Sequence, residues 1–384
     1  MSAGLPVQPV QASRAALARA LLGAPLQAGA DAALATLAAR EGVLPLLEAR
    51  LRQAAEWPSL PAPLRKALQD GARQAVALDL YRRHELARVV AVLAGAGLRV
   101  LVLKGNALGL WLYPQSHLRP TRDIDLLFAS RAEADRAVDV LAPLGYIAEP
   151  DPGTLFFERK CQLRVAGGNR CELDLHCKLL NAPLFADTLP FEELWAASQP
   201  LPGLPAQVRV LGAVHALLHA CLNRVLDIQT GEPERLKLPY DVHLLAGQLD
   251  EAAWRQLQAL ACQRRIAGAC VRVFGETRQL FATEFPPSVL AALDAAAAGE
   301  ALDWSRLGDW RYMQWRNFLA VPGVGGRLRW LYERVFPTRS RMQGRYGEGS
   351  WLQLMGWRLR RGMRLLGNRE AGPPGSATSK EGTT

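Results

Sequence analysis

The sequence predicts an α+β fold, a small mixed sheet with helices flanked by N-terminal and C-terminal helical regions. Two observations support this prediction. Apolar residues recur at intervals of three and four over residues 13–95 and again from about Leu211 to Ala298, as in amphipathic helices. Between these stretches, short branched apolar runs end at glycine or turn residues, which is typical of buried strands.

Changes of pattern along the chain divide it into five expected regions. Gly95 and Gly97 end the N-terminal helices, and the last residues are mostly Gly, Pro, Ser and Thr. The expected regions are an N-terminal helical region (1–96), a mixed α/β core (97–205), a helical domain (206–300), a Trp- and Arg-rich helical C-terminal region (301–368) and a disordered tail (369–384).

The mixed core begins with a strand, a glycine turn, a helix and a second strand. LRVLVLKG (98–105) and TRDIDLLF (121–128) are the expected strands, and NALGLWLY (106–113) between them has helical spacing. SRAEADRAVDVLAPLGY (130–146) is an expected helix, with Ser130 as its N-cap.

A hairpin is expected to follow that helix. TLFFERKCQLRV (154–165) and RCELDLHCKLL (170–180) are its strands, and AGGN (166–169) is a turn sequence. Strand alternation then places Glu172, Asp174 and His176 on one face of the second strand.

Composition describes an ordinary globular protein of 384 residues, 49% hydrophobic and 21% charged. The six cysteines contain no CxxC pair, and the N-terminus lacks a secretory pattern, so we expect reduced thiols and a cytoplasmic protein. No apolar run is long enough to cross a bilayer. The net charge of +10 either attracts nucleic acid, anionic lipid or nucleotide phosphates, or reflects only an arginine-rich composition.

Asp123 and Asp125 raise the main chemical question. Alternation along a strand points both carboxylates the same way, where two like charges repel and lose solvation. A divalent cation would make the arrangement favourable, and Mg²⁺ prefers carboxylate, water and phosphate oxygens. Salt bridges from Asp123 and Asp125 to Arg119 and Arg122 are the alternative.

The glycine turn and the hairpin complete this predicted site. Gly105 and Asn106 lie at a helix N-terminus, whose N–H groups favour an anion such as a triphosphate. Two Mg²⁺ ions about 3.5–4 Å apart can stabilise both oxygens of an in-line displacement. Asp174 is the expected third carboxylate, with Glu172 in reserve, and His176 would contact a phosphate or orient a carboxylate.

The run VLVLKGNALGLWLYPQSHLRPTRDIDLLF, followed by LGY and ELDLH, resembles the uncharacterised bacterial nucleotidyltransferases of the DNA polymerase beta superfamily. The resemblance spans most of residues 30–345, with its specific motifs in 101–176. It implies a minimal nucleotidyltransferase core, two magnesium ions and a nucleoside triphosphate donor such as ATP. Members of this family often occur near polysaccharide-biosynthesis functions.

Residue by residue, the resemblance assigns the metal and catalytic roles to Asp123, Asp125 and Asp174. Tyr113 and Pro114 match the Tyr-Pro of the family.

The expected nucleotide-binding residues are Lys104, Gly105, Asn106, Arg119 and His176. Gly105-Asn106 replaces the Gly-Ser of the wider superfamily. Asparagine still donates a hydrogen bond to phosphate, although it lacks the hydroxyl. Lys104 and Arg119 would either contact phosphate or pair with the aspartates.

Two helical segments have less specific patterns. His215 and His219 have the spacing of a zinc pair, but the segment is apolar and lacks an HExxH glutamate, which favours packed, satisfied histidines. Arg235 and Lys237 precede a helix that carries Asp241. That helix either covers the nucleotide or simply begins with exposed basic residues.

The C-terminal region interleaves tryptophan with arginine. In DWSRLGDWRYMQWRNF (303–318) this mixture would stack on single-stranded bases or form core, and the core is favoured, so nucleic acid is not a favoured partner. WLQLMGWRLRRGMRLL (351–366) has the pattern of an in-plane membrane helix, which would make the protein membrane-peripheral. A helix packed on the domain has the same pattern.

These features predict a magnesium-dependent nucleotidyltransferase. An acceptor oxygen would attack the α-phosphorus of a nucleoside triphosphate and release pyrophosphate. The acceptor would be a small molecule or a sugar in polysaccharide biosynthesis. Transfer to RNA or protein, and a non-catalytic nucleotide-binding scaffold, are the alternatives.

Overall fold

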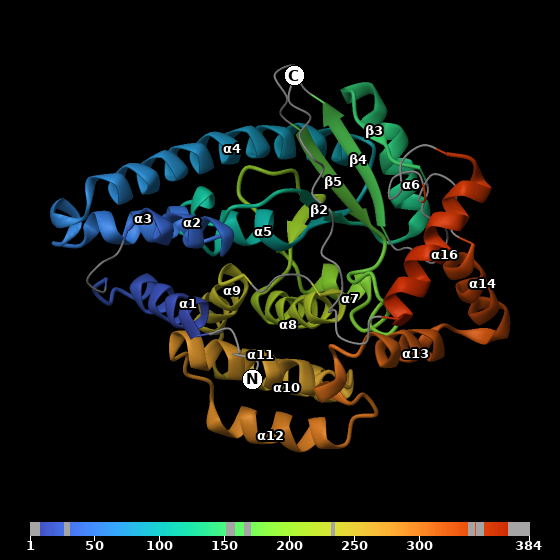
Figure 1. Cartoon of the computed structure of the whole chain (residues 1–384). Helices are drawn as coiled ribbons and strands as arrows, with labels where there is room; N and C mark the ends of the chain where they lie inside the picture. The colour runs from blue at the N-terminus through green and yellow to red at the C-terminus, as the bar shows by residue number, and fades with distance from the viewer. Residues whose placement is uncertain are drawn as a thin grey trace.

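The structure of the chain is a computed structural model, shown in Figure 1, that describes residues 8–26, 31–150, 158–164, 170–231, 235–336, 342 and 349–367. The expected hairpin turn (166–169) and the expected disordered tail (369–384) lie outside these residues.

A seven-stranded sheet lies at the centre of the molecule, in the order β3-β4-β5-β2-β1-β7-β6. The strands are β1 (Val100–Val102), β2 (Ile124–Leu127), β3 (Ile147–Ala148), β4 (Glu158–Arg164), β5 (Arg170–His176), β6 (Gln199–Pro200) and β7 (Val208–Val210). β2 pairs with β5 and β1 with β7 in parallel, and the other pairs are antiparallel. The predicted mixed sheet is therefore confirmed, although β3, β6 and β7 were not predicted.

Helices precede the sheet, connect its strands and follow it. They are α1 (Gln8–Leu21), α2 (Ala32–Arg40), α3 (Leu44–Gln53), α4 (Ala62–Gly95), α5 (Lys104–Trp111), α6 (Arg131–Leu141), α7 (Phe191–Ala196), α8 (Ala213–Thr230), α9 (Lys237–Ala246), α10 (Glu251–Gln263), α11 (Ala267–Phe281), α12 (Pro287–Ala298), α13 (Trp310–Ala320), α14 (Gly323–Val335) and α16 (Trp351–Gly367), with 3₁₀ turns at Trp57–Ser59, Ser116–Leu118, Ala142–Leu144 and Trp304–Arg306.

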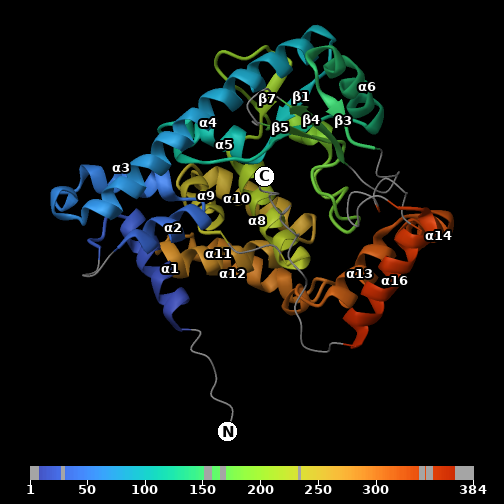
Figure 2. The same cartoon turned by 45° about the horizontal axis from the view of Figure 1, so that its top comes forward.

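Alternate residues of the strands feed two different cores. Ile124, Leu126 and Leu173 belong to the core beneath α4 and α6, whereas Leu101 and Leu127 belong to the core shared with α8 and the helices that follow it. Figures 1 and 2 show α4 and α6 on one side of the sheet and α8 on the other. The sheet is therefore a layer between two sets of helices, and it carries polar side chains on the α8 side.

Ser130 caps α6 as its sequence predicts. Its side chain accepts a hydrogen bond from the backbone N–H of Glu133, and Gly145 adopts a left-handed conformation after the helix. α5, in contrast, begins two residues earlier than expected, at Lys104. The helix therefore starts directly after the buried strand β1.

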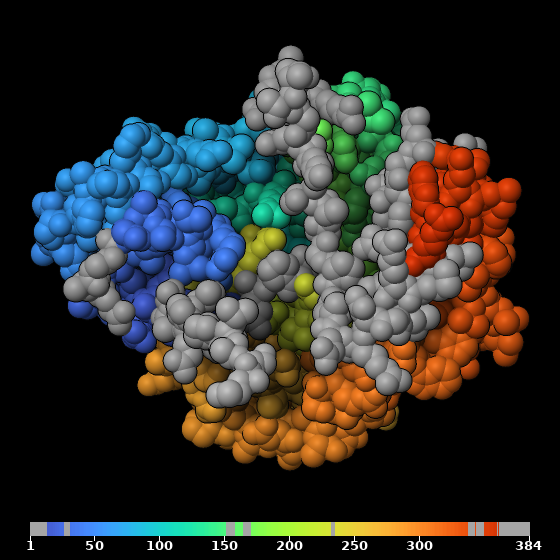
Figure 3. Space-filling view, viewed as in Figure 1, coloured from blue at the N-terminus to red at the C-terminus, as the bar shows by residue number. Residues whose placement is uncertain are grey.

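Two further predictions concern cysteine and tryptophan. All six cysteines are free, as expected. Trp304 packs against the core beside α8, but Trp310 and Trp315 are exposed, so the prediction of a core role was wrong for these two. In Figure 3 the C-terminal helices form one flank of the molecule, apart from the N-terminal helices.

None of the helices in the described part of the chain combines the length and the apolar character that crossing a membrane requires.

Candidate metal centre and active site

Asp125, Asp174 and His176 form a buried cluster on the α8 side of the sheet. One ligand atom from each residue lies within 4.8 Å of the others, and this is the one such group among the described residues. The parallel pairing of β2 with β5 sets Asp125 directly beside Asp174, and His176 follows two residues later on the same face. Strand register therefore brings together side chains that are about 50 residues apart.

Lys104 completes the polar surroundings of Asp125. Its Nζ donates to Asp125 Oδ1 at 2.6 Å, and His176 Nε2 lies 3.0 Å from the same oxygen. Burial alone would raise the pKa of Asp125, but Lys104 and His176 hold that pKa well below its usual range. Burial opposes the charge of Lys104 in turn, and Asp125 outweighs it and raises the pKa of the ammonium.

The backbone of Lys104 is unusual. Its φ is +49°, a left-handed conformation that side-chain-bearing residues seldom adopt and that costs roughly 1–3 kcal/mol. This conformation lies at the turn between β1 and α5, and the Lys104 side chain reaches Asp125 from it. The strained backbone conformation of Lys104 therefore places its ammonium beside the cluster.

Glu158 and Lys160 belong to the same cluster, although the sequence motifs did not indicate them. Both come from β4, where Glu158 pairs with His176 and Lys160 with Asp174. Lys160 Nζ lies 2.9 Å from Glu158 Oε1 and 3.2 Å from Asp174. Burial and the charge of Glu158 raise the pKa of Asp174 to about 6, despite the opposing charge of Lys160.

The alternation of residues along the two hairpin strands could have indicated Glu158 and Lys160. Glu158 and Lys160 alternate along the first strand as Asp174 and His176 do along the second. The hairpin register sets Glu158 opposite His176 and Lys160 opposite Asp174. His176 Nδ1 is buried without a hydrogen-bond partner, with Glu158 Oε2 3.8 Å away.

Two predicted carboxylates lie outside the cluster. Asp123 precedes β2, is half-buried and is not part of the group of ligand atoms. Its charge instead favours the charged forms of the neighbouring Lys104, Arg119 and Lys237 as a minor contribution. Glu172, the reserve ligand, is exposed.

The Gly105-Asn106 turn is tied to β2. Asn106 Nδ2 donates to the backbone oxygen of Asp123 at 2.6 Å. A Cβ on Gly105 would lie 2.4 Å from Thr121 Cγ2 and 2.7 Å from Arg119 Nη1. Glycine is therefore required here because the segment that leads into β2 lies directly against the helix.

Arg119 binds Asp241 of α9 rather than the aspartates of β2. Arg119 Nη2 lies 2.6 Å from Asp241 Oδ2, and Nε lies 3.0 and 3.1 Å from the two carboxylate oxygens. Tyr113 Oη donates to Asp241 Oδ1 at 2.7 Å. Burial opposes the charge of Arg119, yet Asp241 raises its pKa, so the guanidinium stays charged inside the protein.

Lys237 lies at the edge of this ion pair. Its Nζ donates to the backbone oxygen of Pro120 at 3.1 Å. Burial, together with the charge of Arg119, lowers the pKa of Lys237 to about 7. The α9 helix therefore holds the segment before β2 through Asp241 and Lys237, and Lys237 is not merely an exposed residue at the helix start.

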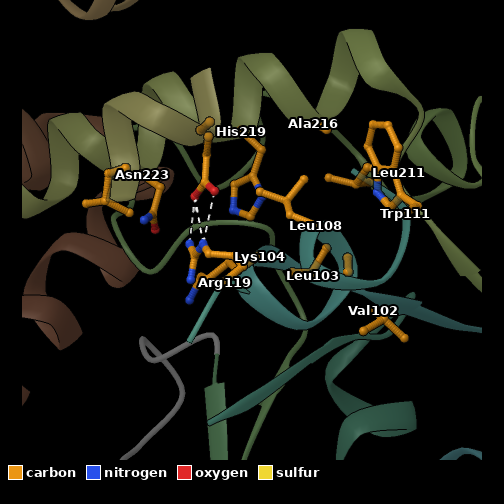
Figure 4. Close-up of a pocket in the computed structure, with 14 residues that line it drawn as sticks. Val102, Leu103, Lys104, Leu108, Trp111, Arg119, Leu211, Ala216, His219 and Asn223 are labelled. Atoms are coloured by element: carbon orange, nitrogen blue, oxygen red, sulfur yellow. Dashed lines mark hydrogen bonds and ion pairs between the residues drawn. The ribbon is translucent and has the colours of Figure 1, made fainter. Parts of the chain in front are cut away.

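A cavity of about 40 Å³ lies between α5, α8 and α9 (Figure 4). His219 Nε2 is buried there without a partner, and so is Trp111 Nε1. Burial and the charge of Lys104 lower the pKa of His219 to about 3, so its ring is neutral. The volume suits about three water molecules.

The prediction for the two histidines of α8 is therefore only partly right. His215 is packed and lies 3.4 Å from Glu193 Oε1, whereas His219 is packed but not satisfied. The two do not form a metal site among the described residues.

The cluster on β2 and β5 fits a divalent cation. Two carboxylates supply hard oxygen ligands, and the imidazole is a ligand that Mn²⁺ or Zn²⁺ accepts more readily than Mg²⁺. The contact between His176 and Asp125 also fits a histidine that orients a metal-binding carboxylate. The neighbouring lysines already balance part of the negative charge, as a cation would.

Comparison with known proteins agrees with this geometry. Residues 29–282, about two thirds of the chain, match the profile of the uncharacterised nucleotidyltransferase family. The matched region contains β1 to β7, the Asp125 cluster and helices α8 and α9. The chain therefore belongs to this family, and it is by class a transferase.

Among solved structures, the chain is similar to that of an antigenic nucleotidyltransferase-like protein from Paracoccidioides brasiliensis. The sequence identity is 16%, the TM-score is 0.35, and the match covers 54% of this chain and 96% of that chain. No curated protein matches the chain.

Proposed function

We propose that the protein transfers a nucleoside monophosphate from a nucleoside triphosphate to an acceptor oxygen in a magnesium-dependent reaction. A bond forms between the acceptor oxygen and the α-phosphorus, and the bond from the α-phosphorus to the oxygen bridging to the β-phosphate breaks. Pyrophosphate leaves, and the acceptor gives up its proton.

One observation carries this proposal. Asp125 and Asp174 lie side by side on parallel strands, with His176 beside them, in a chain whose family is that of nucleotidyltransferases. Two adjacent buried carboxylates are costly without a cation. A scaffold that only needed a stable sheet would gain by replacing them with apolar residues.

Asp125 and Asp174 would hold the metal, with Asp123 as the third carboxylate if it turns toward them. Divalent ions bound there would neutralise charge on the phosphates and lower the pKa of the acceptor hydroxyl. His176 keeps Asp125 oriented through its Nε2 contact. The chain therefore contributes position and charge, which supply most of the rate in phosphoryl transfer.

The residues around the turn would position the triphosphate. Lys104 has a side chain that is 30% exposed, so its ammonium can move from Asp125 to a phosphate when a metal ion takes its place. The N–H groups at the start of α5, at Gly105 and Asn106, would bind the β- and γ-phosphates. Arg119, which pairs with Asp241, would act indirectly, by holding in place the chain segment that leads into β2.

The acceptor is proposed to be a small molecule or a sugar of polysaccharide biosynthesis. Residues 97–205 would carry the chemistry, and the helices of residues 206–300 would cover the nucleotide. A peripheral membrane contact through residues 351–366 belongs to the same proposal.

The test is to incubate the full chain with Mg²⁺, each of the four α-labelled nucleoside triphosphates and a cell extract. We expect label in a small product together with pyrophosphate release. Asp125→Asn should lower the rate by at least about 10³-fold, or roughly 4 kcal/mol of transition-state stabilisation. Asp139→Asn, an exposed carboxylate on the α6 side of the sheet, is the matched control and should keep full activity.

Other results would redirect the proposal. Label on RNA or on protein would identify a macromolecular acceptor. Magnesium-dependent nucleotide binding without pyrophosphate release would favour a non-catalytic scaffold. An Asp125→Asn variant with unchanged activity would remove the cluster from the mechanism.

A further inference from the structure

The net positive charge of the protein is confined to one end of the chain. Residues 310–368 contain twelve arginines and two glutamates, a formal charge of +10 that equals the charge of the whole protein. Residues 1–309 and the last 16 residues are each neutral overall. An arginine-rich composition alone would spread the excess along the chain.

The same end of the chain exposes apolar side chains. Twelve of the sixteen large apolar side chains that are exposed in the described part of the chain lie in residues 310–357. They include Trp310, Val324, Leu328, Tyr332, Leu352 and Trp357. A concentration of this kind marks an interaction surface, because single exposed apolar residues are otherwise scattered.

These residues belong to α13, α14 and α16, which we call the C-terminal arm. Met313 and Asn317 on α13 are buried against the body, and Asn317 accepts a hydrogen bond from the N–H of Leu184 at 3.1 Å. Stacking of Phe336 on Trp351 joins α14 to α16. Figures 1 and 3 show the arm as one flank of the molecule. Its outer surface is therefore exposed, while the contacts of α13 fix the arm to the body.

Within α16 the buried and exposed sides are distinct. Leu354 is fully buried, whereas Leu352 is 76% exposed. Leu352 and Met355 belong to the apolar face that the sequence predicts, and of these two only Leu352 is exposed. One side of α16 is therefore buried, as expected for a packed helix, and Leu352 on another side stays exposed.

We propose that the C-terminal arm binds the surface of an anionic phospholipid bilayer, with α13, α14 and α16 forming one continuous contact. Exposed tryptophan, leucine and valine would enter the interface, and arginines would contact the headgroup phosphates. Glu333 is the one acidic side chain among the described residues of the arm, and it pairs with Arg329. This extends the contact proposed for residues 351–366 and does not depend on the chemistry at Asp125.

Other occupants fit the surface less well. A second copy of the chain would bring two strongly cationic arms together, and they would repel. Single-stranded nucleic acid would use arginine and the aromatic rings but leave the aliphatic side chains, such as Val324 and Leu328, without a partner. A bilayer of anionic lipid accommodates the charge, the rings and the aliphatic groups together.

The test measures sedimentation of the full chain with phosphatidylcholine vesicles that contain or lack phosphatidylglycerol. We expect binding to the anionic vesicles only, weakened by added salt. Arg311→Glu combined with Arg360→Glu should lower the partition coefficient by more than about tenfold, since each basic residue near the surface contributes roughly fivefold. Leu328→Ser combined with Leu352→Ser should lower it by a similar factor.

Matched controls lie on the body of the protein. Leu80 on α4 is 59% exposed, comparable with 62% for Leu328, and Leu80→Ser should keep wild-type binding. Arg272→Glu on α11 changes an exposed arginine outside the arm and should lower binding by less than the arm variants. Asp125→Asn should bind vesicles normally, which separates this proposal from nucleotidyl transfer.

Three outcomes would overturn the proposal. These are equal loss of binding in the arm and body variants, no binding to anionic vesicles by the folded protein, or arm-dependent binding of a single-stranded oligonucleotide without vesicle binding. Thermal melts of each variant show that it folds, and sedimentation equilibrium shows whether the arm pairs two copies instead.

Discussion

Two charged clusters lie close together in this protein, and they differ in how well their ion pairs are buried and hydrogen-bonded. We call the Arg119–Asp241 pair the closed cluster. Arg119 and Asp125 are six residues apart, yet they belong to different clusters. Arg119 meets Asp241 through several hydrogen bonds, and the two side chains are 6% and 4% exposed. Asp125 meets the ammonium of Lys104, whose side chain is 30% exposed, and the imidazole of His176.

The charge balance differs as well. Arg119 and Asp241 neutralise each other with a planar, bidentate geometry that is hard to exchange. Around Asp125 and Asp174, lysines on flexible stems balance the carboxylates, and Lys160 is half exposed. The Arg119–Asp241 pair is therefore a structural connection between the sheet and α9. The lysines around Asp125 and Asp174 can instead be replaced by another cation.

The largest expected effect is on stability and concerns the closed cluster. Asp241→Asn leaves Arg119 buried without a counter-ion, and we expect the free energy of unfolding to fall by about 3–5 kcal/mol. Asp125→Asn should cost less, about 1 kcal/mol, because Lys104 can turn to solvent. Denaturant titration of both variants measures the difference. Asp70→Asn, in an exposed pair with Lys66, is the control and should change little.

Equal losses of unfolding free energy in Asp241→Asn and Asp125→Asn would contradict the proposed difference between the two clusters. They would show that both clusters are structural, and the metal proposal would lose its main support.

A moderate effect is expected on adding metal. Mg²⁺ or Mn²⁺ should raise the melting temperature of the wild type by about 2–4 °C, because an ion that binds only the folded state adds stability. Asp174→Asn should abolish the shift, and chelation should reverse it in the wild type. Differential scanning calorimetry with and without metal measures it.

Asp123→Asn sharpens the same experiment. The sequence predicts Asp123 as a ligand, and the structure sets it outside the cluster. A preserved metal shift in this variant would restrict the site to Asp125, Asp174 and His176, and a lost shift would restore the predicted set.

Much of the site could be predicted because it depends on local pattern. Strand alternation groups Asp174 with His176, and the glycine turn precedes the strand that carries Asp125. The mixed sheet follows from the same short runs. The short strands β3, β6 and β7 were not predicted, since two or three residues carry too little periodicity.

The remaining features depend on distant contacts. Arg119 and Asp241 are 122 residues apart, and nothing in either segment indicates the other. The sequence pattern therefore predicted phosphate or the nearby aspartates as partners of Arg119, and not Asp241. Glu158 and Lys160 depend on the hairpin register, which a pattern of alternation alone does not fix.

The smallest expected effect is a pH dependence at Lys237, beside the closed cluster. Its pKa falls from 10.5 in the unfolded chain to about 7 in the folded protein, because burial and Arg119 disfavour the ammonium. Between these values the unfolded chain binds more protons, so this group makes stability rise with pH from about 7 to 10.5. Below pH 7 the full cost of the buried charge is present.

Lys237→Met should remove this contribution. We expect the variant to gain stability relative to wild type near pH 7, on the order of 1 kcal/mol after partial solvent screening, with the gain shrinking toward pH 10. Denaturant midpoints across this range measure it, and Lys66→Met on the exposed face of α4 is the control. A constant difference at every pH would mean that Lys237 stays charged throughout, and that Asp241 with Asp123 balances both Arg119 and Lys237.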